Sequence, residues 1–147
     1  MEVALRLALI GSPLFAISTL IAAQTPASPY GHWSGQTQYQ AMIGTVSDPA
    51  AHVVIDMTLN IDPRGKVTGF SPENGCHLLG VASPGLAPYI VTLDVTLTGC
   101  VYPRFNRVYK GQLSVLGKDA HGSFSLLAAD ISPPRGSTFT LSATLQR

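Results

Sequence analysis

Few residues of this chain have the types and spacings that catalysis requires. Asp56 and Asp94 are candidate acid–base carboxylates, and each lies within a run of alternating apolar and polar residues. The alternation places both carboxylates on the polar face of a strand, where we expect solvent to surround them. No serine stands in a Gly-x-Ser-x-Gly motif, and no glycine-rich phosphate loop occurs. The sequence therefore predicts a protein that is not an enzyme.

The residues that could bind a metal are scattered. No two of the four histidines have the short spacing that brings two imidazoles to one ion; they are His32, His52, His77 and His121. We therefore expect no metal and no cofactor. The two cysteines, Cys76 and Cys100, are expected to form one disulfide if the chain is exported. A metal-binding pair or a reactive thiol is the alternative, which an oxidising compartment disfavours.

One segment, Gly99–Arg107, has the composition of a binding loop. It contains four residues of the types enriched at protein interfaces, namely Tyr102, Arg104, Phe105 and Arg107. Cys100 would hold the base of the loop and Pro103 would stiffen it, which lowers the cost of ordering on binding. We therefore predict a projecting loop that binds a partner. The alternative is that Tyr102 and Phe105 fold back to plug one end of the domain, with the arginines solvated.

The first residues resemble a secretory signal. An apolar stretch, Leu7–Ile21, is followed by small residues, and we predict a signal peptide over residues 1–23 with cleavage after Ala23 or Ala27. Residues 24–30 would be a short linker and residues 31–147 the folded domain. An uncleaved membrane anchor is the alternative, although the apolar stretch is short for one. No cysteine precedes Cys76, which excludes a lipoprotein anchor. We expect a periplasmic or secreted protein without stable membrane association after cleavage.

The elements that must position these residues are strands. Alternating patterns are clearest in His52–Ile61, in Tyr89–Leu97 and around Phe139–Leu145. Weaker candidates are Trp33–Gln40, Lys66–Ser71, His77–Ala82, Val108–Leu116 and Ser123–Ala129. Short turns rich in proline and glycine separate them, so consecutive strands should pair as antiparallel neighbours. We predict an all-β fold, a small up-and-down barrel of about eight strands, because closure removes exposed edges. A β-sandwich is the alternative.

A short motif supports the barrel. Gly31-His32-Trp33, at the start of the first strand, resembles the Gly-x-Trp signature of lipocalin and avidin-like (calycin) barrels. The resemblance implies structural roles for Gly31 and Trp33, and implies that a basic residue near the end of the last strand, here Arg147, packs over the tryptophan. It does not imply biotin binding, because the chain has a single tryptophan.

The net charge of the chain limits the classes of partner that it can bind. The formal net charge of the 147 residues is +1, and no basic run occurs, so we expect no nucleic-acid partner. The sequence predicts an exported, non-catalytic binding protein whose Gly99–Arg107 loop contacts another extracytoplasmic protein. An inhibitor of a secreted or cell-wall-directed enzyme fits this description. The alternative is a carrier of a small apolar ligand inside the barrel.

Overall fold

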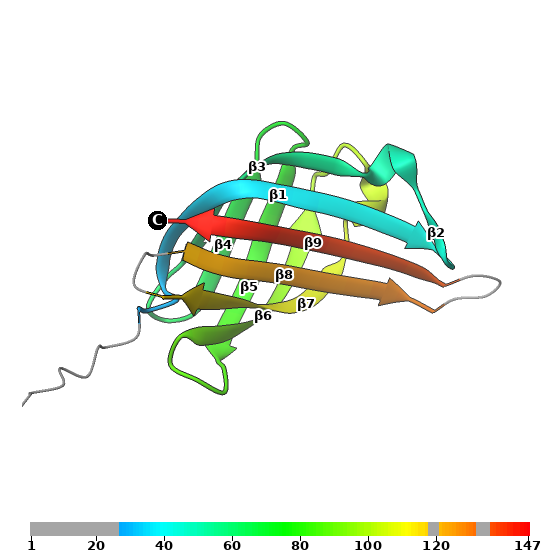
Figure 1. Ribbon diagram of the computed structural model, residues 1–147. Coiled ribbons are helices and arrows are strands. Elements are labelled where there is room, and N and C mark those ends of the chain that lie inside the picture. Colours follow the sequence, from blue (N-terminus) through cyan, green and yellow to red (C-terminus); the bar gives the residue numbers. More distant parts are fainter. Residues whose placement is uncertain (1–26, 118–120, 132–135) are drawn as a thin grey trace, which may run out of the picture.

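A computed structural model describes residues 27–117, 121–131 and 136–147. These residues form nine strands and two short 3-10 turns (Figure 1). The elements in chain order are β1 (Gly31–Ile43), β2 (Val46–Ser47), η1 (Pro49–Ala51), β3 (Val53–Ile61), β4 (Lys66–Ser71), β5 (Cys76–Pro84), β6 (Ile90–Thr98), η2 (Pro103–Phe105), β7 (Val108–Leu116), β8 (His121–Asp130) and β9 (Ser137–Gln146).

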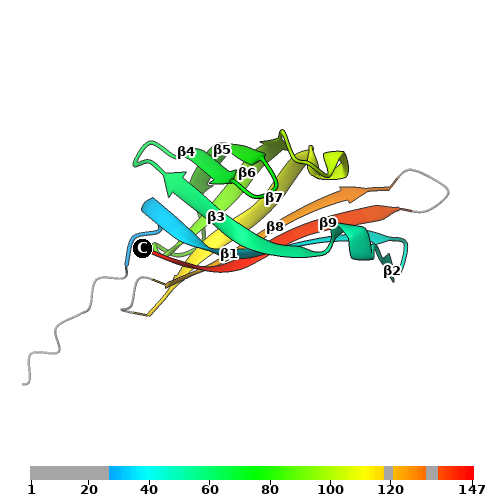
Figure 2. The same cartoon turned by 90° about the horizontal axis from the view of Figure 1, so that it is seen from above.

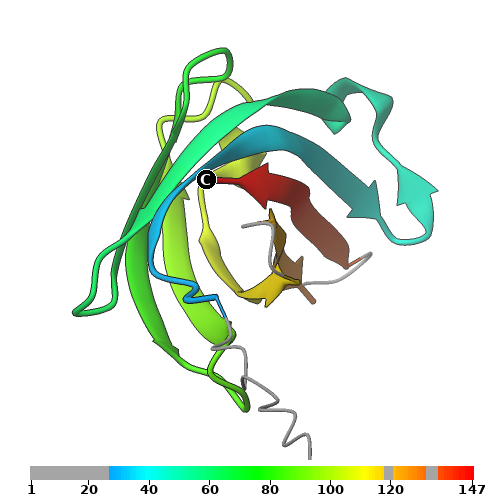
Figure 3. The same cartoon turned by 60° about the vertical axis from the view of Figure 1, so that its left-hand side comes forward.

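The sheet closes on itself. Each strand from β3 to β8 pairs with the next one in sequence, and β1 pairs with both β3 and β9. All of these pairings are antiparallel. The closed ring is visible end-on in Figure 3. The predicted eight-stranded up-and-down barrel is therefore confirmed, and the sandwich alternative is wrong. The two-residue β2 is an additional strand that pairs only with the end of β1.

The alternating pattern of the sequence accounts for the strands. In β3, the buried side chains are Ile55, Met57, Leu59 and Ile61, and the residues between them face outward. The same alternation holds in β6 and β9. Strand β1 is longer than predicted, because it extends from Gly31 to Ile43 rather than from Trp33 to Gln40. A strand of this length pairs with β3 over Gly31–Tyr39 on one edge and with β9 over Ser34–Ile43 on the other edge.

The barrel has two different ends. We call one the loop end, which carries the connections 44–52, 72–75 and 99–107. The other is the terminal end, where β1 begins and β9 finishes. Figure 1 shows the C-terminus at the terminal end and the two 3-10 turns at the opposite end. In Figure 2, β1 and β9 run side by side between these ends.

Large side chains occupy the barrel interior. The largest that are fully buried are Trp33, Tyr39, Tyr109, Phe105, Phe124, Phe139 and Met57. Two buried polar residues accompany them. The Ser71 hydroxyl lies 2.8 Å from the Tyr39 hydroxyl, and the Thr37 hydroxyl has no hydrogen-bond partner among the described residues. This packing favours a filled interior over a ligand cavity.

The predicted signal peptide, residues 1–23, lies outside the described residues. Ala27 and Tyr30, in the predicted linker, pack against the core. None of the helical segments among the described residues has the length and hydropathy needed to span a membrane.

Candidate functional site

The predicted disulfide is present and lies at the loop end. Cys76 begins β5 and Cys100 follows β6, and their Cα atoms are 4.2 Å apart. Gly75 and Gly99 precede the two cysteines, with φ angles of 68° and 74°. Both angles lie in the left-handed region, which favours glycine. The backbone can therefore turn sharply just before each of the two cysteines. A disulfide is typical of an oxidising, extracytoplasmic environment.

The loop after Cys100 is ordered by hydrogen bonds of its own. The Val101 amide donates to the Asn74 carbonyl oxygen at 2.8 Å, which joins the loop to the β4–β5 turn. The Cys100 amide donates to Asn106 Oδ1 at 2.9 Å. Proline begins η2, and the Asn106 amide donates to the Pro103 carbonyl oxygen. The loop is thus held at both its beginning and its end.

Phe105 is the part of the loop that enters the barrel. Its side chain is only 2% exposed and contacts two rings from opposite parts of the chain. The Phe105 centroid lies 5.3 Å from that of Tyr39 on β1 and 5.7 Å from that of Phe139 on β9, both in edge-on geometry. The Tyr109 hydroxyl donates to the Phe105 carbonyl oxygen at 3.1 Å. For Phe105, the structure therefore agrees with the alternative that the ring folds back to plug the barrel end, and the expectation that it projects into solvent is wrong. Burying this apolar ring is more favourable than exposing it.

Tyr102 lies over Phe105 and remains half-buried. The two ring centroids are 5.5 Å apart. The Tyr102 hydroxyl donates to Asp48 Oδ2 at 2.5 Å, while Asp48 Oδ1 accepts the Ala50 amide and caps η1. The hydrogen bond to the Asp48 carboxylate raises the pKa of Tyr102, because ionisation would remove the proton that the hydroxyl donates in this bond. Asp48 therefore couples the Cys100 loop to the β2–β3 connection.

The two loop arginines, Arg104 and Arg107, lie over the Phe139 ring at the loop end of the barrel. The Arg107 guanidinium lies 3.9 Å from the centroid of the Phe139 ring, and that of Arg104 lies 5.4 Å from it. Arg104 donates to the Ser137 hydroxyl at 3.1 Å, and Arg107 Nε donates to the Arg104 carbonyl oxygen at 2.7 Å. Such cation–π contacts hold both cations over the ring. Both arginine side chains are half-exposed, and these contacts fix their positions.

The three loop-end connections enclose a small hollow, which we call the loop-end notch. Its volume is about 340 Å³. The buried part of its lining is apolar and consists of Ala51, Ile55, Cys100 and Phe105. The exposed part includes Glu73, Val53 and Val101, and the Val101 side chain is 77% exposed. The notch therefore combines an apolar floor with one carboxylate at the rim.

The terminal end carries the residues of the Gly-x-Trp motif. Trp33 is buried and donates from Nε1 to the Pro29 carbonyl oxygen at 2.9 Å. The Arg147 guanidinium lies 4.6 Å from the Trp33 ring centroid, where the calycin resemblance implies a basic residue. Arg147 also donates to the carbonyl oxygens of Ser28 and Tyr30. These contacts hold the chain before β1 against the end of β9.

Comparison with known proteins leaves the fold without an assigned relative. No family model matches the chain, and neither a curated protein nor a solved structure matches it. The function must therefore be argued from the geometry of the chain itself.

The other residues considered from the sequence do not line the loop-end notch. Asp94 is exposed on β6 and forms an ion pair with Lys110 at 2.8 Å, and Asp56 is exposed on β3. His52 Nε2 lies 2.8 Å from the Gln38 amide nitrogen on the outside of the barrel. In the described parts of the chain, no three His, Cys, Asp or Glu side chains gather in a way that could hold a metal ion.

Sequence reasoning missed Asp48, Glu73 and Asn74. Each belongs to a turn, and the dipeptides Asp48-Pro49 and Asn74-Gly75 are typical turn sequences. They indicate the turns but not their shared position. Only closure of the barrel brings these turns beside the Cys100 loop.

Two buried tyrosines should make the fold sensitive to alkaline pH. Burial raises the pKa of both Tyr39 and Tyr109 above the usual 10.0. The unfolded chain ionises first, so stability is complete below pH 10 and falls as the pH rises further. The expected loss is about 1.4 kcal/mol per pH unit for each tyrosine.

Urea unfolding at a series of pH values from about 8 to about 11, a range that spans the usual titration of tyrosine, would measure this loss. Tyr109→Phe removes one titrating group and should reduce the slope above pH 10. An unchanged slope in this variant would contradict the assignment.

Proposed function

We propose that this chain is an exported, non-catalytic binding protein that contacts a partner protein with its loop end. The observation that carries the proposal is the loop-end notch beside a preordered loop. A partner's apolar side chain would enter the notch, where Ala51, Ile55 and Phe105 form the floor. A neighbouring cation on the partner would approach Glu73, whose side chain has no ion pair in the described parts of the chain.

The order of the loop supports this role. The disulfide, the Val101–Asn74 bond and the Tyr102–Asp48 bond hold the exposed side chains in place before any partner arrives. Binding then costs little conformational entropy. Tyr102, Arg104 and Arg107 are half-exposed and are of the types that contribute most at interfaces. Phe105 contributes indirectly, as the floor on which Tyr102 rests.

The compartment and family are part of the same proposal. A disulfide together with an N-terminal signal peptide would place the mature protein in the periplasm or outside the cell. The Gly31–Trp33 motif and the Arg147 contact support a calycin-like barrel. A compact binding protein in that compartment fits an inhibitor of a secreted or cell-wall-directed enzyme. The alternative of an apolar ligand carrier is less favoured, because large side chains fill the interior.

Affinity capture with a matched pair of variants tests the proposal. Val101→Glu places a carboxylate at the rim of the notch, and Leu86→Glu places one at an apolar position near the terminal end that is even more exposed. The immobilised protein is exposed to the extracytoplasmic fraction of its source. We expect a partner to be retained by the wild type and by Leu86→Glu, and to bind Val101→Glu about 30-fold more weakly in calorimetry.

Two results would count against a loop-end binding site. One is that no captured protein depends on Val101. The other is that Leu86→Glu weakens binding as much as Val101→Glu does, since this would show a general effect of added charge.

A further inference from the structure

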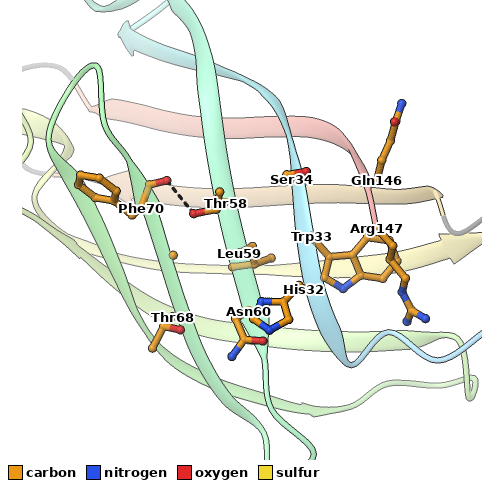
Figure 4. Close-up of a pocket in the computed structure, with 11 residues that line it drawn as sticks. His32, Trp33, Ser34, Thr58, Leu59, Asn60, Thr68, Phe70, Gln146 and Arg147 are labelled. Atoms are coloured by element: carbon orange, nitrogen blue, oxygen red, sulfur yellow. Dashed lines mark hydrogen bonds between the residues drawn. The ribbon is translucent and has the colours of Figure 1, made fainter.

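A second hollow lies on the outside of the barrel and is separate from the loop-end notch. We call it the outer groove. It has a volume of about 340 Å³ and crosses β1, β3 and β4 (Figure 4). Six outward-facing side chains line it: His32, Ser34, Thr58, Asn60, Thr68 and Phe70. None of them lines the loop-end notch.

The strand register arranges these side chains in two rows. Asn60 pairs with His32 on one side and Thr68 on the other, which makes the first row. Thr58 pairs in the same way with Ser34 and Phe70, which makes the second row. Neighbouring strands lie about 4.8 Å apart, so each row spans roughly 10 Å. Gln146 and Arg147, at the end of β9, border the groove beside β1.

Phe70 gives the groove one apolar surface. Its ring is 39% exposed and stacks on the imidazole of His77, with the centroids 4.6 Å apart and the planes 29° apart. The stack fixes the orientation of an aromatic ring on an open sheet face. The backbone carbonyl oxygen of Phe70 accepts a hydrogen bond from the Thr58 hydroxyl at 3.4 Å, shown as the dashed line in Figure 4.

The remaining side chains offer unused neutral hydrogen-bonding groups. Among the described residues, the side chains of His32, Ser34, Asn60 and Thr68 form no hydrogen bond with protein groups. They supply hydroxyl, amide and imidazole groups, each of which can both donate and accept. No carboxylate side chain lines the groove, and the guanidinium of Arg147 is engaged by Trp33 and two backbone carbonyl oxygens.

These properties of the outer groove indicate which chemical class of ligand it fits. The guanidinium of Arg147 lies over Trp33 and donates from Nη2 to backbone carbonyl oxygens, so it is less available to an anion, and a cation would find no carboxylate side chain. An extended peptide cannot add to the sheet here, because β1, β3 and β4 are each paired on both sides. A neutral sugar presents hydroxyls on its rim and an apolar C–H face, which match the polar rows and the Phe70 ring.

We propose that the outer groove binds a neutral carbohydrate. One sugar unit lies against Phe70, and hydroxyls of the bound saccharide exchange hydrogen bonds with Asn60, Thr68 and His32. This site is independent of the loop-end partner site. A chain that carries both can bind a glycan through its outer face and a protein through its loop end.

Nuclear magnetic resonance titration of the ¹⁵N-labelled protein tests the proposal. The probes are chitotetraose, cellotetraose and maltotetraose, with the anionic tetragalacturonate as the charged comparison. We expect at least one neutral probe to shift the amide resonances of β1, β3 and β4 in a saturable way, with a Kd of about 1 mM or tighter. The resonances of Ala51, Val101 and Tyr102 in the loop-end notch should not move, which separates this result from the fate of the loop-end proposal.

Matched variants on the outer face complete the test. Phe70→Ala should weaken binding by up to about tenfold through the loss of ring stacking, and Asn60→Ala should weaken it through the loss of hydrogen bonds. Leu79→Ala removes an exposed apolar side chain from neighbouring β5, outside the groove, and should bind as the wild type does. The proposal is overturned if no neutral probe shifts these resonances, if tetragalacturonate binds equally well, or if a folded Phe70→Ala binds with wild-type affinity.

Discussion

Phe105→Ala is expected to lower the free energy of unfolding by about 3–5 kcal/mol. The ring is almost fully buried and packs edge-on against Tyr39 and Phe139, which belong to the two strands that close the barrel. Alanine would leave a cavity that the paired strands cannot collapse to fill. The Tyr102 ring would also lose the surface on which it rests. Urea unfolding followed by Trp33 fluorescence would measure the loss.

Two control variants test whether the lost stability comes from the buried ring. Phe105→Leu keeps much of the apolar volume and should lose clearly less stability than Phe105→Ala. Arg104→Ala changes a half-exposed side chain of the same loop and should cost about 1 kcal/mol or less. If Phe105→Ala unfolds at the wild-type urea concentration, the ring is not buried in solution and the plug at the loop end does not exist.

The expected instability also affects how binding is studied. A variant lacking Phe105 would lose a partner through local unfolding as readily as through a lost contact. Val101 is the better position for a binding test, because its side chain is exposed and its backbone amide makes the ordering bond to Asn74 whatever the side chain.

Replacing both cysteines is the second change with a large expected effect. Cys76→Ala combined with Cys100→Ala should lower the free energy of unfolding by about 3 kcal/mol, because the disulfide closes a loop with a sequence separation of 24 residues. Removing both thiols together avoids leaving a free buried cysteine. Chemical denaturation of the variant and of the oxidised wild type would measure the difference.

The same variant should loosen the loop end before the rest of the barrel. The bridge lies beside the Val101–Asn74 hydrogen bond, so amide exchange at Val101 should accelerate more than exchange at Leu113, in the middle of β7. Equal acceleration at both amides would show that the disulfide stabilises the whole domain without ordering the loop in particular. The proposed preorganisation of the binding surface would then lose its basis.

Much of the fold was predictable because its cause is local. A period of two in apolar residues needs only neighbouring positions, and it correctly indicated the buried faces of β3, β6 and β9. Short turns then left antiparallel neighbours as the simplest topology. The ends of β1 were not predictable in this way. Its last residues, Met42 and Ile43, are strand because they pair with Thr138 and Ser137 of β9 and with the two-residue β2.

The candidate site was predictable only in part. Composition drew attention to the segment after Cys100 and left two possibilities open for Phe105, projecting or folded back. It did not decide that Phe105 would face inward while Val101 faces solvent. In a 3-10 turn between strands there is no simple alternation to reveal which side chain is buried. The direction of each side chain depends on what the other loops leave open.

The sequence by itself determined the class of fold, the pairing of the two cysteines and the inward faces of the strands, because each follows from local patterning or from there being one possible partner. Only the tertiary structure decided the rest. The notch combines Ala51, Glu73 and Phe105, and the outer groove combines His32, Asn60 and Phe70. Residues so far apart in the chain meet only when the strands take their register and the barrel closes, so no local pattern records that they are neighbours.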